Sequence, residues 1–254
     1  MGAGEEDLRP RAECADHRHL IAVPPNGNVI DFFTDILPNG TPRLALLRSF
    51  DKGETWEAKP TIITIMSFSF TGTITPDLQE PVRDGAILFD VAVDRVTGRL
   101  YIVWQDTRFR GIDQVAFSQS SDNGATWSRP IRIDRTPPNA NILRQQAFVP
   151  SIEVGPDGEL VVTYYNFQND TAETPEATDY WSVFCSSDCT RRAGRGGRRS
   201  GSWWRHDDRA GANGRKWEGS RRGGSPTPPD GRASTSPPTR SRRQKRKGDG
   251  SRPA

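Results

Sequence analysis

The stretch from Trp104 to Arg110 holds the side chains best suited to chemistry. It reads Trp-Gln-Asp-Thr-Arg-Phe-Arg and continues an apolar, β-branched run that predicts a β-strand. Alternate side chains of an extended chain point to the same side, so Asp106 and Arg108 are expected to lie together. This pair is our candidate catalytic pair, with Asp106 as acid/base or hydroxyl acceptor and Arg108 binding an anion. The alternative is a structural ion pair at a strand end, or a bridge to a neighbouring element.

An eight-residue pattern occurs twice in the chain. Residues 49–56 (box 1) and 120–127 (box 2) both read Ser-x-Asp-x-Gly-x-Thr-Trp, and their aspartates lie 71 positions apart. A repeat at this period is typical of propellers and solenoids. Aspartate accepts hydrogen bonds from the backbone of a tight turn, and glycine adopts the positive φ that such a turn needs. The pattern predicts a self-contained turn, made by Ser49, Asp51, Gly53, Thr55 and Trp56 in box 1 and by Ser120, Asp122, Gly124, Thr126 and Trp127 in box 2.

Each box belongs to a wider repeat of two extended runs joined by a glycine turn. The turns contain Gly27, Gly98 and Gly158, and their β-branched and aromatic flanks predict hairpins. The box aspartate follows each of the first two glycines by 24 residues. In the third copy Ser186 and Asp188 begin the pattern again, with Asp188 30 residues after Gly158. The polar stretch 166–178 accounts for the longer spacing.

The two boxes and the third beginning resemble the Asp-box, or bacterial neuraminidase repeat, of the sialidase-like β-propellers. The resemblance covers about residues 19–190. It implies an all-β fold of about three blades, a partial form of a six-bladed propeller. It also implies that each box joins the outer two strands of its blade, away from the central substrate pocket. We therefore interpret the box residues as structural.

The resemblance further implies an exo-sialidase type of glycoside hydrolase. Such an enzyme holds the substrate carboxylate with an arginine triad and uses a tyrosine paired with a glutamate as nucleophile, with an aspartate as acid/base. The signature Phe/Tyr-Arg-Ile-Pro is missing from this sequence, where Leu8-Arg9-Pro10 is only a weak match. Two hypotheses follow: a sialidase-like hydrolase, truncated or inactive in this form, and a non-catalytic propeller that binds glycans or proteins.

No pattern in the sequence indicates a cofactor or a metal site. The three histidines have no ligand spacing, and the sequence contains no P-loop or dinucleotide-binding fingerprint. The cysteines, Cys14, Cys185 and Cys189, have no zinc-like spacing either. Cys185 and Cys189 are compatible with a small disulfide in an exported protein, and equally with two free thiols.

The composition changes abruptly after residue 190. From there to the end the sequence has no Ile, Leu, Val, Met, Phe or Tyr, and it carries 19 basic against five acidic residues. The net charge of +3 thus averages a basic tail and an acidic remainder. With so little to bury, residues 191–254 are predicted to be disordered. Three origins stay open: a shifted reading frame, a solvated linker, or an arm that binds nucleic acid through phosphate contacts.

The sequence therefore divides into an irregular N-terminal segment (1–18), the blades (19–190) and the tail (191–254). It shows neither an apolar signal region after Met1 nor a stretch long enough for a transmembrane helix. The resemblance nevertheless implies an extracellular or exported protein. A glycan or glycoconjugate is the expected partner, nucleic acid being restricted to the tail.

Overall fold

The computed structural model describes residues 15–68, 72–82, 85–170, 177–186, 189–190 and 203–205. Within these residues the regular structure consists of β-strands and one short 3-10 helix, η1 (Ile142–Gln145). Neighbouring strands pair antiparallel throughout the described sheets. The prediction of an all-β chain is confirmed.

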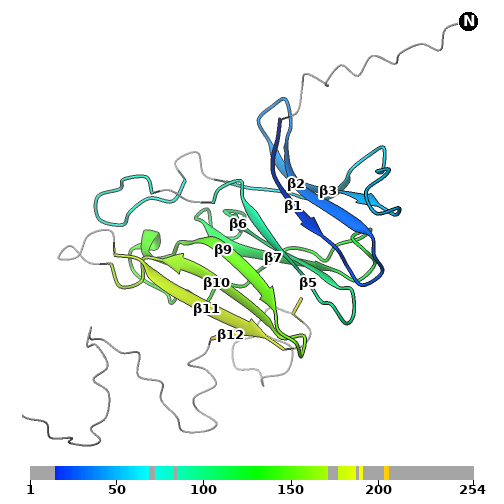
Figure 1. Cartoon of the computed structure of the whole chain (residues 1–254). Coiled ribbons are helices and arrows are strands. Elements are labelled where there is room, and N and C mark those ends of the chain that lie inside the picture. The colour runs from blue at the N-terminus through cyan, green and yellow to red at the C-terminus, as the bar shows by residue number, and fades with distance from the viewer. Residues whose placement is uncertain are drawn as a thin grey trace, which may run out of the picture. The chain divides into compact units, whose positions relative to one another are not determined.

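The strands form three four-stranded sheets, each in chain order (Figure 1). We call them blades 1, 2 and 3, because a four-stranded antiparallel meander is the unit of a β-propeller. Blade 1 contains β1 (Ala15–Ala22), β2 (Val29–Ile36), β3 (Pro42–Ser49) and β4 (Thr61–Ile65). Blade 2 contains β5 (Phe89–Val93), β6 (Leu100–Asp106), β7 (Gln114–Ser120) and β8 (Ile131–Arg132). Blade 3 contains β9 (Ala147–Val154), β10 (Leu160–Asn166), β11 (Asp179–Cys185) and β12 (Trp204–Arg205).

The hairpins between the first two strands of each blade form where the sequence predicts them. Gly27, Gly98 and Gly158 have φ of +80°, +73° and +78°, which is the left-handed conformation that glycine adopts without a steric penalty. The flanking strands then pair antiparallel, β1 with β2, β5 with β6 and β9 with β10. The wider repeat of the sequence is therefore a repeat of hairpins.

Two apolar cores hold the blades together. One core lies between blades 1 and 2 and joins Ile30 and Phe32 to Ile102 and Trp104, all fully buried. The other core joins blade 2 to blade 3, and its largest side chains are those of Tyr101, Phe117, Tyr164 and Trp203. Strand β6 contributes to both cores, so all seven of its residues are buried. Alternate side chains of a strand point to opposite faces, and blade 2 is covered on both.

Each blade has two ends that differ in what they carry. The end at which β2, β6 and β10 begin carries the hairpins and the boxes, and we call it the box end. At the other end the same three strands stop, and two long links, 66–88 and 133–146, lead from one blade to the next. We call this the loop end. Its loops are where side chains from different blades can meet.

The fourth strand of blade 3 lies within the segment that the sequence predicts to be a disordered tail. Trp204 pairs with Phe184 and Arg205 with Val183, which makes β12 the outer neighbour of β11. Trp203 is 2% exposed and packs edge-on against Phe117, with ring centroids 5.0 Å apart. A large aromatic ring supplies the buried area that the surrounding Arg and Gly residues lack. The remaining tail positions lie outside the described residues.

Candidate functional site at the loop end of the blades

Box 1 forms the predicted turn between β3 and β4. The Ser49 hydroxyl donates to the Asp51 carboxylate (2.7 Å) and accepts from the backbone N–H of Gly53 (2.7 Å). Asp51 also accepts from the backbone N–H of Thr55 (2.8 Å) and from its hydroxyl (2.5 Å). The turn is thus closed by its own side chains.

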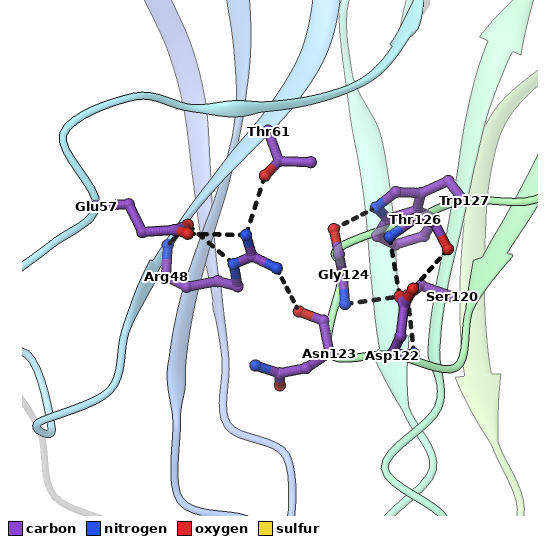
Figure 2. A network of polar contacts seen from close by, with 9 residues as sticks. All are labelled: Arg48, Glu57, Thr61, Ser120, Asp122, Asn123, Gly124, Thr126 and Trp127. Atoms are coloured by element: carbon purple, nitrogen blue, oxygen red, sulfur yellow. Dashed lines mark hydrogen bonds and ion pairs between the residues drawn. The ribbon is translucent and has the colours of Figure 1, made fainter.

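Box 2 repeats these bonds between β7 and β8. Asp122 accepts from the hydroxyls of Ser120 (2.7 Å) and Thr126 (2.5 Å) and from the backbone of Thr126 (2.9 Å). Trp127 donates its indole N–H to the backbone oxygen of Gly124 (3.1 Å). Figure 2 shows the turn beside Arg48 of blade 1, whose guanidinium donates to the backbone oxygen of Asn123 (3.5 Å). The polar side chains of both boxes are therefore used in hydrogen bonds within the protein.

The box aspartates are strong acids for the same reason. The hydroxyl and backbone N–H of Thr55, then the hydroxyl of Ser49, lower the pKa of Asp51 from 3.8 to about 2. Burial raises the pKa of Asp122, but its hydrogen bonds from Thr126 and Ser120 outweigh that effect and lower it. A carboxylate that accepts several hydrogen bonds is held ionised. Neither group is suited to donating a proton near neutral pH.

The third box is shifted by one residue from the predicted position. Ser49 pairs with Val29, Ser120 with Leu100 and Cys185 with Leu160, and each of these partners is the first residue of its second strand. Cys185, not Ser186, thus occupies the first position of the box. Ser186 is exposed, and Asp188 lies outside the described residues. Cys185 and Cys189 form a disulfide, which decides between the two alternatives that the sequence left open.

Asp106 and Arg108 lie side by side at the loop end of β6, as the period of two predicts. Their ion pair measures 2.7 Å, and Asp106 is fully buried. Asp106 also accepts from the indole N–H of Trp104 (2.6 Å) and from the backbone N–H of Arg108 (2.8 Å). Arg108 reaches back to blade 1 and donates to Thr64 and to the backbone oxygen of Ile65. This geometry favours the alternative interpretation, a strand-end ion pair that bridges two blades, over direct contact with a substrate.

A second polar cluster at the loop end was not anticipated from the sequence. Asp77 lies in the first link, Arg144 in η1 of the second link, and Asp170 in the loop after β10. A guanidinium nitrogen of Arg144 lies 3.3 Å from the Asp77 carboxylate, and the Asp77 carboxyl is within hydrogen-bonding reach of Asp170. Three segments that are distant in the sequence therefore place their charged groups together.

The two links are fixed to each other next to this cluster. The Gln146 amide donates to the backbone oxygen of Ile74 (2.7 Å) and accepts from its backbone N–H (3.2 Å). The Asn141 amide donates to the backbone oxygen of Pro76 (3.3 Å). These bonds hold Asp77 and Arg144 in place through their neighbours. A polar group on a loop that is held in this way is positioned for binding or catalysis.

The carboxyl of Asp170 is set up to hold a proton. It is fully buried, and burial together with the nearby Asp77 carboxylate raises its pKa above 3.8, although Arg144 opposes the shift. One of its oxygens accepts from the backbone N–H of Ala177 (3.2 Å), whereas the other has no hydrogen-bond partner. A neighbouring carboxylate disfavours ionisation, so Asp170 keeps its proton to a higher pH than an isolated aspartate does. Asp77, with 22% of its side chain exposed, is the partner that faces solvent.

The separation of these carboxyls limits the chemistry that they support. The two carboxyl groups of a glycosidase flank the scissile bond at about 5–5.5 Å or about 6.5–9.5 Å from each other. The Asp77 carboxylate is near enough to Asp170 to raise the pKa of the Asp170 carboxyl, and we treat the two as one unit. Such a unit can supply one acid or base, but not a nucleophile as well.

A further candidate is Arg18 on the innermost strand of blade 1. A β-bulge between His17 and His19 leaves Arg18 with φ of +49°, and Val149 on β9 has φ of +50° at a similar register shift. Positive φ is costly for residues with a Cβ and is concentrated at functional positions. The Arg18 side chain is exposed, and its guanidinium lies 5.9 Å from the centre of the Phe89 ring. It is thus available to an anion at the loop end.

The opposite ends of the three inner strands surround a hollow of about 630 Å³. Its walls come from the ends of β1, β5 and β9 and include Ile21, Val93, Asp94 and Glu153. Within the described ranges no three His, Cys, Asp or Glu side chains gather as a metal site would require. Those same ranges contain no helix of the length and apolarity needed to cross a bilayer.

The described residues form three consecutive four-stranded antiparallel blades, the unit of a β-propeller. A Hadza microbial sialidase, Hz136, is 19% identical with a TM-score of 0.44, over 67% of this chain and 35% of the sialidase. An alpha-L-arabinanase from Penicillium chrysogenum, complexed with arabinobiose, is 13% identical with a TM-score of 0.43, over 66% of this chain and 45% of the arabinanase. A protein of unknown function from Dyadobacter fermentans is 13% identical with a TM-score of 0.43, over 76% of this chain and 57% of that protein.

This chain therefore spans between about a third and somewhat more than half of the length of these similar structures. No protein-family model and no curated protein sequence matches it. Any function must consequently be argued from the geometry of the described residues.

Proposed function

We propose that the chain acts on glycans at the loop end of its blades, as a sialidase-like glycoside hydrolase. The observation that carries this proposal is the cluster that three distant segments form at the loop end, with the Arg144–Asp77 ion pair beside the buried Asp170 carboxyl. Perturbed carboxyl pairs that join surface loops are a physical signature of acid/base sites. The Asp-box interpretation of boxes 1 and 2 supports the same class of protein.

In this proposal Asp77 is the residue that meets the sugar, because part of its carboxyl is exposed. Asp170 behind it is the group that holds a proton, since burial and the Asp77 carboxylate raise the pKa of Asp170. Arg144 binds Asp77 and fixes its orientation. Asp170 is fully buried and is therefore a positioning residue rather than a group that touches the sugar.

Arg18 supports an acidic sugar as the substrate class. Its exposed guanidinium lies on the inner strand of blade 1, at a bulge that turns the side chain away from the regular alternation of the strand. A guanidinium binds a carboxylate through two parallel hydrogen bonds, which suits a sialic acid better than a neutral pentose. An extracellular or exported location fits this function, and the Cys185–Cys189 disulfide supports it, because disulfides persist in oxidising compartments.

A non-catalytic glycan-binding protein is the second candidate. It is favoured because, among the described residues of the loop end, Asp77 and Asp170 are neighbours rather than two carboxyls set apart across a glycosidic bond. Binding would then use the same loop end, with Arg18 and Arg144 as the anion-binding groups. The two candidates differ only in whether a glycosidic bond is broken.

The experiment is to incubate the chain with fluorogenic aryl α-sialosides and aryl α-L-arabinofuranosides, and to measure binding of the free sugars by calorimetry. For the hydrolase, the sialoside is cleaved, Asp77→Asn abolishes cleavage, and Arg18→Ala raises KM. The matched control is Asp157→Asn, an exposed turn residue at the box end. Binding without cleavage selects the second candidate. Neither binding nor cleavage by the folded chain overturns both.

A further inference from the structure

The disulfide of blade 3 stands where blades 1 and 2 have a hydrogen bond. In the first two boxes the serine at position one accepts from the glycine backbone four residues later, at 2.7 Å for Ser49 and 3.0 Å for Ser120. Cys185 has the position of these serines in the strand register, and Cys189 follows it by four residues. The same two positions are thus linked in all three blades, covalently only in the third.

The tryptophan beneath the turn is replaced in the same way. In box 2 the Trp127 indole donates to the backbone oxygen of Gly124, and its ring packs edge-on against Phe32 of blade 1 at 6.0 Å. In blade 3 the Trp203 indole donates to the backbone oxygen of Cys189 (2.9 Å), and its ring packs edge-on against Phe117 of blade 2. Each tryptophan therefore joins the fifth box position to the preceding blade.

We propose that the Cys185–Cys189 disulfide is a redox-sensitive clamp that holds the outer strand of blade 3. Its ring fixes the Cys189 carbonyl at the place where the Trp203 indole binds it. Strand β12 has two paired residues, and the buried Trp203 ring beside them adds a side-chain anchor. A further anchor of the described segment is the Arg135 guanidinium, which donates to the Trp203 backbone oxygen. A hydrogen-bonded box would hold the strand under all redox conditions, whereas a disulfide holds it only when oxidised.

The chemical step is thiol–disulfide exchange with a dithiol. A thiolate of the dithiol attacks one sulfur of the disulfide, the S–S bond breaks, and a mixed disulfide forms with release of the other cysteine as thiolate. The second thiol of the dithiol then displaces the mixed disulfide, so two electrons pass to the protein and the dithiol is oxidised. Cys185 is fully buried and Cys189 is 7% exposed, so the attack requires the edge of blade 3 to open first.

The test is hydrogen exchange of the full chain, with and without dithiothreitol, read on the backbone of β11 and of residues 203–205. The amides that β11 directs to β10 serve as an internal reference. In oxidised protein we expect protection of the amides that bond β11 to β12, at the pairs Val183–Arg205 and Phe184–Trp204. Reduction is expected to speed their exchange by about tenfold or more, as local opening does. Protection that survives complete reduction, verified by thiol labelling, overturns the clamp.

Two variants separate the clamp from general damage to the blade. The box-restoring variant Cys185→Ser, Ser187→Asp, Cys189→Gly supplies the residues that boxes 1 and 2 have at these positions. It is expected to protect β11 regardless of dithiothreitol. The variant Cys185→Ala, Cys189→Ala is expected to lose protection in both conditions. If the first variant behaves like the second, the equivalence of disulfide and box is refuted. Should either variant fail to fold, the wild-type comparison still decides.

Discussion

Gly124 of box 2 lies directly against Leu46 of blade 1. A Cβ placed on Gly124 would come within 2.9 Å of the Leu46 Cδ2 atom, closer than real Cβ contacts come. Gly53 of box 1 has a similarly positive φ, +99° against +81°, but nothing within 4 Å of its Cβ direction. The two boxes therefore share the bonds of their serine, aspartate and threonine but differ in packing. Box 2 is part of the joint between blades 1 and 2, and box 1 is not packed in that way.

This difference predicts unequal costs for the same substitution. Gly53→Ala and Gly124→Ala both force a Cβ into the left-handed region, at about 1–2 kcal/mol each. Gly124→Ala must also displace Leu46 from a packed core, for about 1–3 kcal/mol more. Urea unfolding of both variants checks this expectation. If the two variants lose the same free energy of unfolding, Leu46 can move away from the new Cβ without destabilising the core.

The acid side of the stability profile follows from the box carboxylates. Asp51 has its pKa lowered to about 2, mainly by Thr55, and hydrogen bonds from Thr126 lower that of Asp122 against the opposing effect of burial. A group with a lowered folded-state pKa stabilises the fold above its unfolded pKa and loses this contribution as the pH falls through the folded value. The free energy of unfolding is therefore expected to fall between about pH 4 and pH 2. Asp51→Asn should flatten this slope in pH-dependent thermal unfolding, whereas Asp157→Asn should not.

The boxes could be predicted from the sequence because their bonds are local. The turn is bonded by Ser49, Asp51 and Thr55, which are close in the chain. The residues that make these bonds are the same residues that define the repeat. The third box shows the limit of this reasoning. Ser186 and Asp188 match the pattern by letter, but the strand register assigns the first position to Cys185. The pairing of Cys185 with Leu160 decides which residue takes the first box position. This pairing depends on the strand register, which the local sequence does not show.

The candidate site could not be predicted because its parts are joined only by the fold. Asp77 and Asp170 belong to different blades' loops, and no spacing relates them. The alternation of side chains along a strand correctly predicted that Asp106 and Arg108 lie together. It did not predict that the buried Trp104 indole also donates a hydrogen bond to Asp106. The burial of Trp203 was not predicted, because the prediction of disorder used the average composition of the tail. Such an average does not show that one aromatic ring is buried.

Substitution at the Asp106–Arg108 pair tests its structural interpretation. Arg108→Ala leaves the fully buried Asp106 carboxylate without its cation and is expected to destabilise the fold by about 3 kcal/mol. Adding Asp106→Asn should restore part of this loss, because the uncompensated charge is then removed. Chemical denaturation of the single and double variants measures the coupling. A stable Arg108→Ala variant that loses only glycan binding would instead return the pair to the catalytic hypothesis.

The Asp170 pair predicts a pH effect of the opposite sign. Its pKa is raised by burial and by Asp77, so its contribution to stability is complete below 3.8 and is lost as the pH rises through the folded value. Asp170→Asn replaces the protonated acid by a neutral amide that never ionises. The melting temperature of this variant relative to wild type is therefore expected to rise from pH 4 to pH 8. A difference independent of pH would show that Asp170 is ionised throughout and holds no proton.

Truncation on either side of β12 separates the fold from the tail. A chain that ends at residue 190 lacks Trp203, whose removal from the core with Phe117 is expected to cost about 3–5 kcal/mol. A chain that ends at residue 205 keeps that ring and should melt like the full chain.

The same two truncated chains test the nucleic-acid hypothesis, because the shorter deletion already removes most of the basic residues of the tail. Binding of the full chain to single-stranded DNA should then weaken steeply with salt, weaken in the 1–205 chain and disappear in the 1–190 chain, which lacks the whole tail. Binding that persists in that chain, or that does not depend on salt, would assign the contact to the blades.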